Sequence, residues 1–561
     1  MKKTYLYLIT VCVFAGLSTN SQAQNMRYVD PIYAESDVEV VANITYATNI
    51  DFLISNMKST KVPKDITALK TAVFLGNPIP AAYYNPADTS TAVKVTAIKM
   101  DVYKVKSSVD SKTDRPVIIF LHTGNFLPSP INGSPVGTRV DSSAIVLCKE
   151  WARRGYVAVS ASYRLGWNPI APTEVERTGT LLNAVYRAIH DVKKCVIYLK
   201  DDAAGANTYG ISNNIALYGE GTGAYIVNAY TTLDSYSEIE LPKFLTPAGK
   251  SVIDTANVGL IDGTRGLVNL YLPSTTSSEV TITIAAGGAM ADTSWIEAGD
   301  KPMLAFQCIR DPFAPFDEGI VIVPTTGAAV VEVQGSNLYI KKAVELGNND
   351  AFKDIAGKDI YTKMARAKYG KTYDYIYPSQ TTITLNTGLE GLYPIDVTAG
   401  ASVFQNQAGP WQWWDPTSPL ATYVGQTGKS NHVLSLTSNP DMSPAKGRAY
   451  IDTIMGYMCP RVAIANGDYT AEDFASTRLV SAFPASVYPN PANNGVMVKL
   501  EGGNMIKHVA MYDLVGNLIY TSNGIYASGH YIDLMDIKNG FYFIEIQSDL
   551  GSVSRKVEVI H

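Results

Sequence analysis

Three loops that each follow an apolar run carry the residue types that nucleophilic catalysis uses. His122-Thr123-Gly124 follows the run 117–121, Gly219-Glu220-Gly221-Thr222-Gly223 follows 214–218, and Asp311 follows 304–309. Nucleophilic catalysis needs a hydroxyl or thiol, a histidine base and a group that orients the histidine. Ligands of parallel sheets bind at the carboxyl ends of the strands. If the three runs are strands of one such sheet, these loops are the candidate site.

The elements between the loops predict such a sheet. Strands are expected at 92–105, 116–121, 156–163, 214–218, 280–285 and 302–308. Helices are expected at 142–154, where Ile145, Cys148 and Trp151 share one face, and from about 179 to 201. Strands that alternate with helices are typical of a mostly parallel, doubly wound α/β sheet with helices on both faces.

The loop sequences also match a family. His122-Thr123-Gly124-Asn125-Phe126, Tyr163-Arg164-Leu165-Gly166-Trp167 and Gly219-Glu220-Gly221-Thr222-Gly223-Ala224 occur in this order. They resemble the secreted carboxylesterase-like branch of the α/β-hydrolase family over most of 38–459. The resemblance implies an α/β-hydrolase domain at 24–460, an oxyanion loop at His122-Thr123-Gly124 and an acid at Asp311.

The resemblance also implies a nucleophile at the centre of G-x-S-x-G, on the turn between a strand and a helix. The residue at that position is Gly221, which has no side chain and cannot attack a carbonyl. Thr222 stands one residue later, where the family uses the backbone N–H for the oxyanion hole, so its hydroxyl should point elsewhere. The oxyanion loop also departs from the family's H-G-G pattern, because its second residue is Thr123. The elbow is therefore degenerate.

No histidine fits the position of the general base. Downstream of Asp311, the only one before the C-terminal tail is His432, and the separation of 432 − 311 = 121 residues is longer than is usual in the family. His432 is thus a weak candidate base and is expected to be a surface or satisfied loop histidine. His122 should pack against and orient the oxyanion loop, and His190, in a predicted helix, should cap or pack.

Two functions of different classes follow. In the first, the domain is a catalytically inactive binding or structural module; in the alternative, it is an active carboxylic ester hydrolase with an unconventional nucleophile such as Ser142, Ser143 or Ser129. The first is favoured because those serines lack the elbow. Trp411-Gln412-Trp413-Trp414-Asp415 could stack against a sugar, which makes a glycan a candidate ligand, or could be packing. The sequence shows no metal-ligand spacing and no cofactor loop.

Four cysteines, Cys148, Cys195, Cys308 and Cys459, lie beyond the N-terminal segment, and no C-x-x-C spacing indicates zinc or a redox site. Buried thiols and disulfides are both compatible with this pattern. In the hydrolase family, the helix after the third strand and the final helix lie on the same side of the sheet. The resemblance therefore implies a Cys148–Cys459 disulfide as the most plausible pair.

The first residues predict a secretory signal. Lys2 and Lys3 precede an apolar stretch at 5–16, and Ser21-Gln22-Ala23 suits signal peptidase, so we expect a signal peptide at 1–23. The apolar stretch is shorter than a bilayer-spanning helix, and no later window is long enough, so no membrane span is expected. The net charge of −5, without a basic block, argues against a nucleic-acid partner.

The tail is a second domain. A polar linker at 461–484 precedes 485–561, where apolar residues alternate, as in Tyr542, Ile544 and Ile546, which predicts a small all-β, Ig-like sandwich. Its motifs are Tyr488-Pro489-Asn490-Pro491, Asp513 to Gly516, and Gly540 with a closing Lys556. They resemble the type A sorting domain of the type IX secretion system. The resemblance implies a secretion translocon and a sortase-like signal peptidase as partners, and an extracellular or outer-surface location after Sec export.

Overall fold

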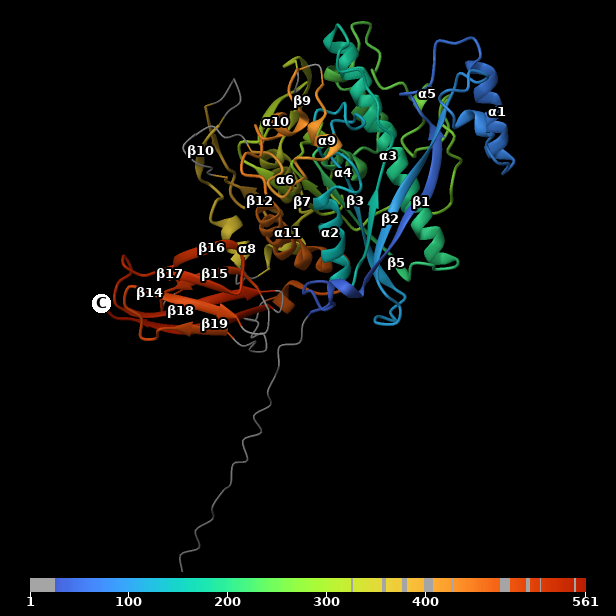
Figure 1. The fold of residues 1–561 in the computed structure, drawn as a ribbon. Helices are drawn as coiled ribbons and strands as arrows, with labels where there is room; N and C mark the ends of the chain where they lie inside the picture. The colour runs from blue at the N-terminus through green and yellow to red at the C-terminus, as the bar shows by residue number, and fades with distance from the viewer. Residues whose placement is uncertain are drawn as a thin grey trace, which may run out of the picture.

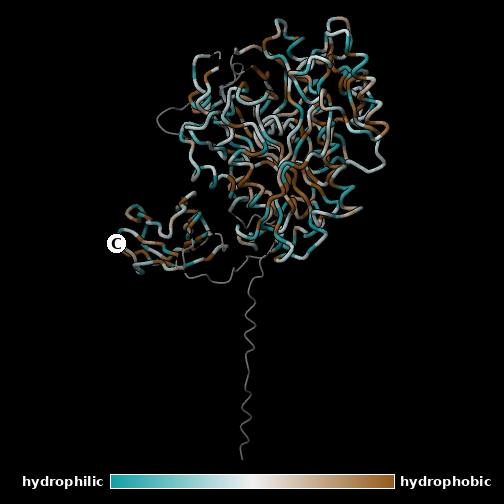
Figure 2. Tube along the Cα trace, turned by 45° about the vertical axis from the view of Figure 1, so that its right-hand side comes forward, coloured by the Kyte–Doolittle hydropathy of each residue, from teal (hydrophilic) through white to brown (hydrophobic). Residues whose placement is uncertain are grey.

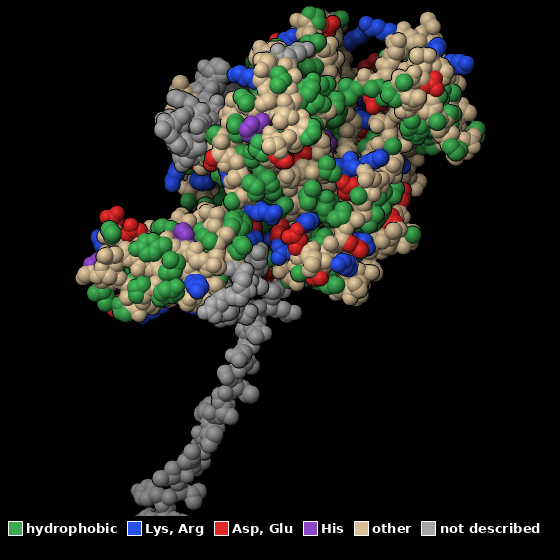
Figure 3. Space-filling view, viewed as in Figure 1, with side chains coloured by type: hydrophobic (Ala, Val, Ile, Leu, Met, Phe, Trp, Pro, Cys, Tyr) green, Lys and Arg blue, Asp and Glu red, His purple; other side chains and the backbone are tan. Residues whose placement is uncertain are grey.

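The computed structural model describes residues 26–323, 326–355, 360–375, 381–397, 407–425, 427–474, 485–500, 505–514, 516–548 and 551–561. The expected signal peptide at 1–23 lies outside these residues. None of the described helices has the length and apolar character needed to cross a membrane. On the face drawn in Figure 3, acidic and basic side chains are intermingled.

An eight-stranded sheet forms the centre of the larger domain (Figure 1). Its order is β1-β2-β4-β3-β5-β6-β7-β12, with β2 antiparallel to both neighbours and the other pairs parallel. The bounds are β1 Val38–Ile50, β2 Val95–Val105, β3 Arg115–Leu121, β4 Val157–Ala161, β5 Ile211–Glu220, β6 Ile282–Ala286, β7 Met303–Cys308 and β12 Leu392–Ile395. This doubly wound sheet confirms the predicted α/β-hydrolase fold.

Helices cover both faces of the sheet because its central strands are apolar on both sides. Side chains of β3 alternate between two cores: Val117 and Ile119 contribute to the core under α3 Glu174–Ala204 and α4 Thr222–Thr232. Ile118 and Phe120 contribute to the core under α2 Ser142–Arg153 and α11 Pro444–Ala465. Figure 2 shows hydrophobic residues concentrated along these central elements.

Shorter elements complete the larger domain. They are α1 Val62–Phe74, α5 Thr255–Val258, β8 Glu318–Ile322, β9 Ala329–Gln334, α6 Ser336–Glu345, α7 Asp350–Lys353, α8 Ile360–Arg366, β10 Thr372–Asp374, β11 Thr382–Thr384, α9 Pro419–Thr422 and α10 Asn431–Ser435. The hairpin β8–β9 is anchored to α3, where the Thr178 hydroxyl donates to the Val330 carbonyl. This hairpin, α9 and α10 gather at one end of the sheet in Figure 1.

The predicted end of the larger domain at residue 460 differs from the observed helix boundary. Helix α11 continues through Pro460 to Ala465, five residues into the segment expected to be linker. Proline removes one helical hydrogen bond. The helix persists because Val462 and Ala463 are fully buried on the same apolar face, and Arg461 Nη1 donates to the Tyr457 carbonyl at 2.8 Å.

The tail forms two antiparallel sheets around its own core. One sheet has the order β13-β14-β17 and the other β16-β15-β18-β19. The bounds are β13 Ala485–Tyr488, β14 Gly495–Leu500, β15 Ile506–Tyr512, β16 Leu518–Ala527, β17 Gly529–Asp533, β18 Gly540–Ser548 and β19 Gly551–Val559. Ile544 and Ile546 point into the core between the sheets, as the alternation predicted. The all-β tail is confirmed.

Two polar contacts join the tail to α11. The Asp452 carboxylate accepts from Lys507 Nζ at 3.0 Å and from the Tyr526 hydroxyl at 2.7 Å. The two domains are therefore docked through a specific pair of hydrogen bonds as well as through the chain.

Candidate functional site

The elbow between β5 and α4 keeps its sharp geometry although it carries no nucleophile. Gly221 has φ 52° and ψ −111°, a conformation that side chains disfavour. Its N–H donates to the Ala286 carbonyl at 2.8 Å, which fixes the turn to the neighbouring strand. The bend is therefore retained, and at its apex stands the one residue that adopts this conformation without strain.

Thr123 occupies the space that a nucleophile would need. A Cβ built on Gly221 would lie 2.2 Å from Thr123 Oγ1 and 2.9 Å from Thr123 Cβ, both shorter than real contacts allow. The departures at positions 123 and 221 are therefore one feature: a side chain in the oxyanion loop fills the place that the missing side chain leaves. Sequence reasoning noted both residues and missed their contact, because it joins loops almost a hundred residues apart.

Thr222 and His122 take part in a group of contacts around the oxyanion loop. The Tyr163 hydroxyl donates to the His122 carbonyl at 2.7 Å and lies 3.1 Å from Thr222 Oγ1. The His122 ring stacks on Tyr163, and its Nδ1 donates to the Thr123 carbonyl at 2.6 Å. Burial lowers the pKa of His122 to about 4, so the ring is neutral at neutral pH. His122 thus orients the loop, as the resemblance implied.

Asp311 lies where the resemblance places the acid, after β7, and it lines the same cavity as Gly221. It also makes a local turn, since its Oδ1 accepts from the N–H groups of Phe313 at 2.8 Å and Ala314 at 3.1 Å. Burial raises the pKa of Asp311 to about 7. The carboxyl is therefore partly protonated at neutral pH and can donate a hydrogen bond to a ligand.

None of the described histidines occupies the position of a general base beside the elbow. His432, in α10, accepts from Trp414 Nε1 at 3.1 Å and does not line the cavity. His190 is buried in α3 with its ring edge-on to Tyr186, and burial lowers its pKa well below the usual value. Among the described residues, no hydrogen bond joins a histidine ring to Asp311 or to a serine hydroxyl.

The alternative serines are no better placed. Ser143 is buried near Glu220, and Ser129 Oγ accepts from Asn132 Nδ2 at 3.3 Å. Ser142 begins α2, and among the described residues no hydrogen bond joins it to a histidine. Glu220 itself is buried, accepts from Gln412 Nε2 at 2.9 Å, and has its pKa raised by burial to about 8.

A cavity of about 930 Å³ opens beside the elbow. Its walls are mostly apolar and come from the loop after β3, from α3, α4, the β8–β9 hairpin and α10; examples are Phe126, Leu182, Tyr225, Val331 and Leu434. Trp411 and Trp414 also line it, but their side chains are only 1% and 7% exposed. The tryptophan cluster therefore packs as cavity wall and offers no open ring face to a sugar on the molecular surface.

The predicted Cys148–Cys459 disulfide is wrong. All four described cysteines are free and buried. The helices that carry the pair, α2 and α11, do pack in one core as the resemblance implied. However, Cys459 Sγ turns toward Met455 Sδ, 3.8 Å away on its own helix. Burial raises the pKa of the Cys459 thiol to about 12, so the thiol is inert in the folded state.

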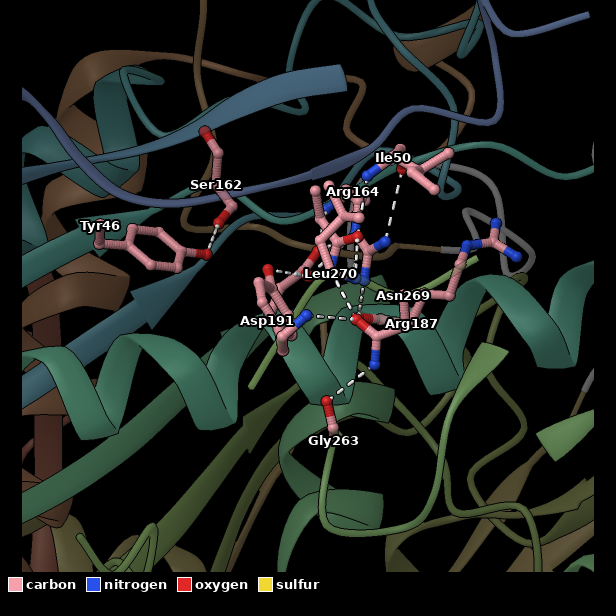
Figure 4. A network of polar contacts seen from close by, with 11 residues as sticks. Tyr46, Ile50, Ser162, Arg164, Arg187, Asp191, Gly263, Asn269 and Leu270 are labelled. Carbon is pink, nitrogen blue, oxygen red and sulfur yellow. Dashed lines mark hydrogen bonds and ion pairs between the residues drawn. The ribbon is translucent and has the colours of Figure 1, made fainter. Parts of the chain in front are cut away.

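A buried ion pair positions the loop after β4, which carries Tyr163 and Trp167 (Figure 4). Arg164 Nη2 lies 2.8 Å from Asp191 Oδ1, and the Arg164 N–H donates to Asp191 Oδ2 at 2.8 Å. The Tyr271 hydroxyl donates to Asp191 Oδ1 at 2.6 Å. Charge pattern alone did not reveal this network, because its members lie on three segments far apart in the sequence.

The predicted sorting motifs lie at the edge of the tail sandwich. Asn490 Nδ2 donates to the Lys556 carbonyl at 2.9 Å, and the Glu558 N–H donates to Asn490 Oδ1 at 2.9 Å. The first motif is thereby attached to the closing strand. Asp513 caps the turn before β16, because its Oδ1 accepts from the Asn517 N–H at 2.8 Å.

Comparison with known families identifies this tail. Residues 486–560 match the family described as secretion system C-terminal sorting domain. The tail is a type IX secretion sorting domain. Its presence makes the protein a secreted or cell-surface protein, as the motifs predicted. A search of curated proteins finds no match to the sequence.

Solved structures similar to the larger domain are esterases of Thermogutta terrifontis. The apo form of esterase 2 is 18% identical, with a TM-score of 0.25, over 39% of this chain and 70% of that one. The butyrate-bound form is 18% identical, with a TM-score of 0.24, over 43% and 77%. At such low TM-scores, the likeness indicates nothing about activity. The fold follows from the order and direction of the strands.

Proposed function

We propose that the α/β-hydrolase-like domain of this secreted protein is a non-catalytic binding module for an apolar small molecule. The observation that carries the proposal is the contact at the elbow: Gly221 supplies no nucleophile, and Thr123 fills the space where one would stand. A chain that had lost the serine alone would leave that space empty.

The rest of the constellation supports the same conclusion. Removal of a triad nucleophile reduces turnover by about a millionfold, and the oxyanion hole with binding retains about a thousandfold over water. Here the base is also missing, because His432 is engaged with Trp414 and His122 with the Thr123 carbonyl. No described histidine is placed to take a proton from a hydroxyl at the elbow and return it to a leaving group.

The cavity sets the ligand class. Its volume of about 930 Å³ is that of a small-molecule site, and its walls are apolar. The polar groups that line it include Thr222, at the start of α4, and the Asp311 carboxyl. The first N–H groups of a helix attract an acceptor. We therefore infer a ligand with an apolar body and a terminal oxygen function.

The binding experiment uses an amphiphilic fluorescent dye and a matched pair of variants on α10. Leu434 lines the cavity, whereas its neighbour Val433 is 47% exposed and does not. The full chain should bind 1-anilinonaphthalene-8-sulfonate at one site. Leu434→Asp should weaken dye binding by about tenfold or more, because it places a charge in the apolar wall, and Val433→Asp should leave the affinity unchanged. Equal effects of the two variants, or no saturable binding, would refute the cavity as the site.

We also propose that export follows Sec recognition of residues 1–23 and recognition of the tail by the type IX translocon and its sortase-like signal peptidase. The match of 486–560 to the sorting family supports this route. Deletion of 485–561 should leave the larger domain in the periplasm. Normal appearance of the truncated protein outside the cell would contradict the proposal.

A further inference from the structure

A second, smaller pocket lies next to the main cavity. Its volume is about 340 Å³, and its wall includes Phe52, Leu53, Trp167, Asn168, Thr180 and Arg187. Leu53, Trp167 and Asn168 also line the main cavity, so the two spaces share one wall. The pocket is apolar on one side, with a single cationic side chain among its lining residues.

Arg187 is only 5% exposed, and no carboxylate of the described residues forms an ion pair with it. Its Nη2 donates to the Gly166 carbonyl at 2.7 Å, and its Nε–H has no acceptor among the described residues. The guanidinium carbon lies 4.2 Å above the Phe52 ring. Burial lowers the pKa of Arg187 to about 9, so the group is still charged at neutral pH. Buried charges without a partner are costly.

The nearby carboxylates are already engaged. Both oxygens of Asp191 accept hydrogen bonds from Arg164, and Oδ1 also accepts from Tyr271. Asp51 Oδ1 accepts from the Leu53 N–H at 2.8 Å within its own loop. In Figure 4 the Arg187 side chain extends away from the Arg164–Asp191 pair. The charges of Asp191 and Asp51 favour the charged form of Arg187 from nearby, but neither carboxylate makes a direct ion pair with it among the described residues.

We propose that this pocket binds the carboxylate of a small organic acid, with Arg187 as its counter-ion. Guanidinium groups match carboxylates in charge and shape. One cation surrounded by the neutral side chains of Asn168 and Thr180 suits a monoanion better than a dianion such as phosphate. The rings of Phe52 and Trp167 suit the hydrocarbon part of the acid. The site stands whether or not the main cavity binds a ligand.

The test compares hexanoate with 1-hexanol, which has the same carbon chain without the charge, by calorimetric titration of the full chain. Hexanoate should bind about tenfold or more tightly, as a charge-assisted hydrogen bond implies. Arg187→Met should abolish the preference. Lys429→Met removes the cation that lines the main cavity and should leave the preference intact. Equal binding of acid and alcohol, or a preference that survives Arg187→Met or disappears in Lys429→Met, would overturn the proposal.

A second variant covers the case in which Arg187→Met does not fold. Asn168 is an exposed residue on the pocket wall, so Asn168→Asp should fold and place a negative charge beside the bound carboxylate. It should remove the preference for hexanoate over 1-hexanol. A preference of unchanged size in folded Asn168→Asp would contradict the site.

Discussion

Gly221→Ser should destabilise the larger domain, and simultaneous Thr123→Gly should recover the part of the loss that comes from the collision. The serine Cβ would lie 2.2 Å from Thr123 Oγ1, a contact that forces local rearrangement. Overpacking of this kind costs about 1–3 kcal/mol. The backbone at φ 52° and ψ −111° adds about 1–3 kcal/mol for any residue other than glycine. The expected loss for the single variant is thus about 2–6 kcal/mol.

The double variant separates the cost of the collision with Thr123 from the cost of the backbone conformation at residue 221. Thr123→Gly removes the colliding atoms and leaves the backbone strain, so the two substitutions should couple favourably by about 1–3 kcal/mol. Gly249→Ser is the matched control: its φ is also positive, at 72°, but no atom lies within 4 Å of an added Cβ. It should show only a backbone cost of about 1–3 kcal/mol.

Urea unfolding followed by tryptophan fluorescence measures these free energies. All six tryptophans lie between residues 151 and 414, so the signal reports the larger domain and not the sorting domain. Additive effects of Thr123→Gly and Gly221→Ser, or equal losses for Gly221→Ser and Gly249→Ser, would refute the argument that Thr123 fills the nucleophile's space.

Three further outcomes are expected. Because burial raises the pKa of Glu220 to about 8, the folded state binds its proton more tightly than the unfolded state, so the stability that protonated Glu220 contributes is present at low pH and lost as pH rises through 8. Between pH 5 and 9, the free energy of unfolding measured in urea should therefore decline less for Glu220→Gln than for the native chain. Parallel curves would contradict this. Arg164→Ala leaves Asp191 buried and unpaired and should cost about 3–5 kcal/mol, whereas Lys112→Ala, at an exposed pair, should cost less than about 1 kcal/mol; similar losses in urea would refute the difference. In the unreduced chain without residues 1–23, a thiol reagent should detect four cysteines after denaturation and none before it. Detection of only two after denaturation would show a disulfide.

The apolar runs were sufficient to predict six of the eight strands of the sheet, all except β1 and β12. The run at 116–121 became β3, and that at 302–308 became β7, within one residue at each end. Such strands are buried on both faces, so composition alone marks them. Strand β1 was not predicted, because several of its residues are exposed and its place depends on an irregular antiparallel pairing with β2.

The candidate site was predicted in its parts but not in its contacts. Motif order located Gly221 and Asp311, yet the collision with Thr123 exists only where the loops after β3 and β5 meet. The thiol pairing failed for a similar reason: helix packing brings two cysteines into one core, but side-chain direction decides whether they bond. Arg187 gave no sequence signal, since an unpaired buried cation is defined by what surrounds it.

Intact-mass spectrometry after treatment with a fluorophosphonate shows whether the folded chain carries an activated hydroxyl, which the glycine at the elbow cannot supply. The unaltered full chain, at neutral pH and in probe excess, should show no covalent adduct, with an active serine esterase labelled in parallel as the control. Stoichiometric addition of one phosphonyl group to the folded chain, mapped to any cavity-lining hydroxyl, would contradict the account.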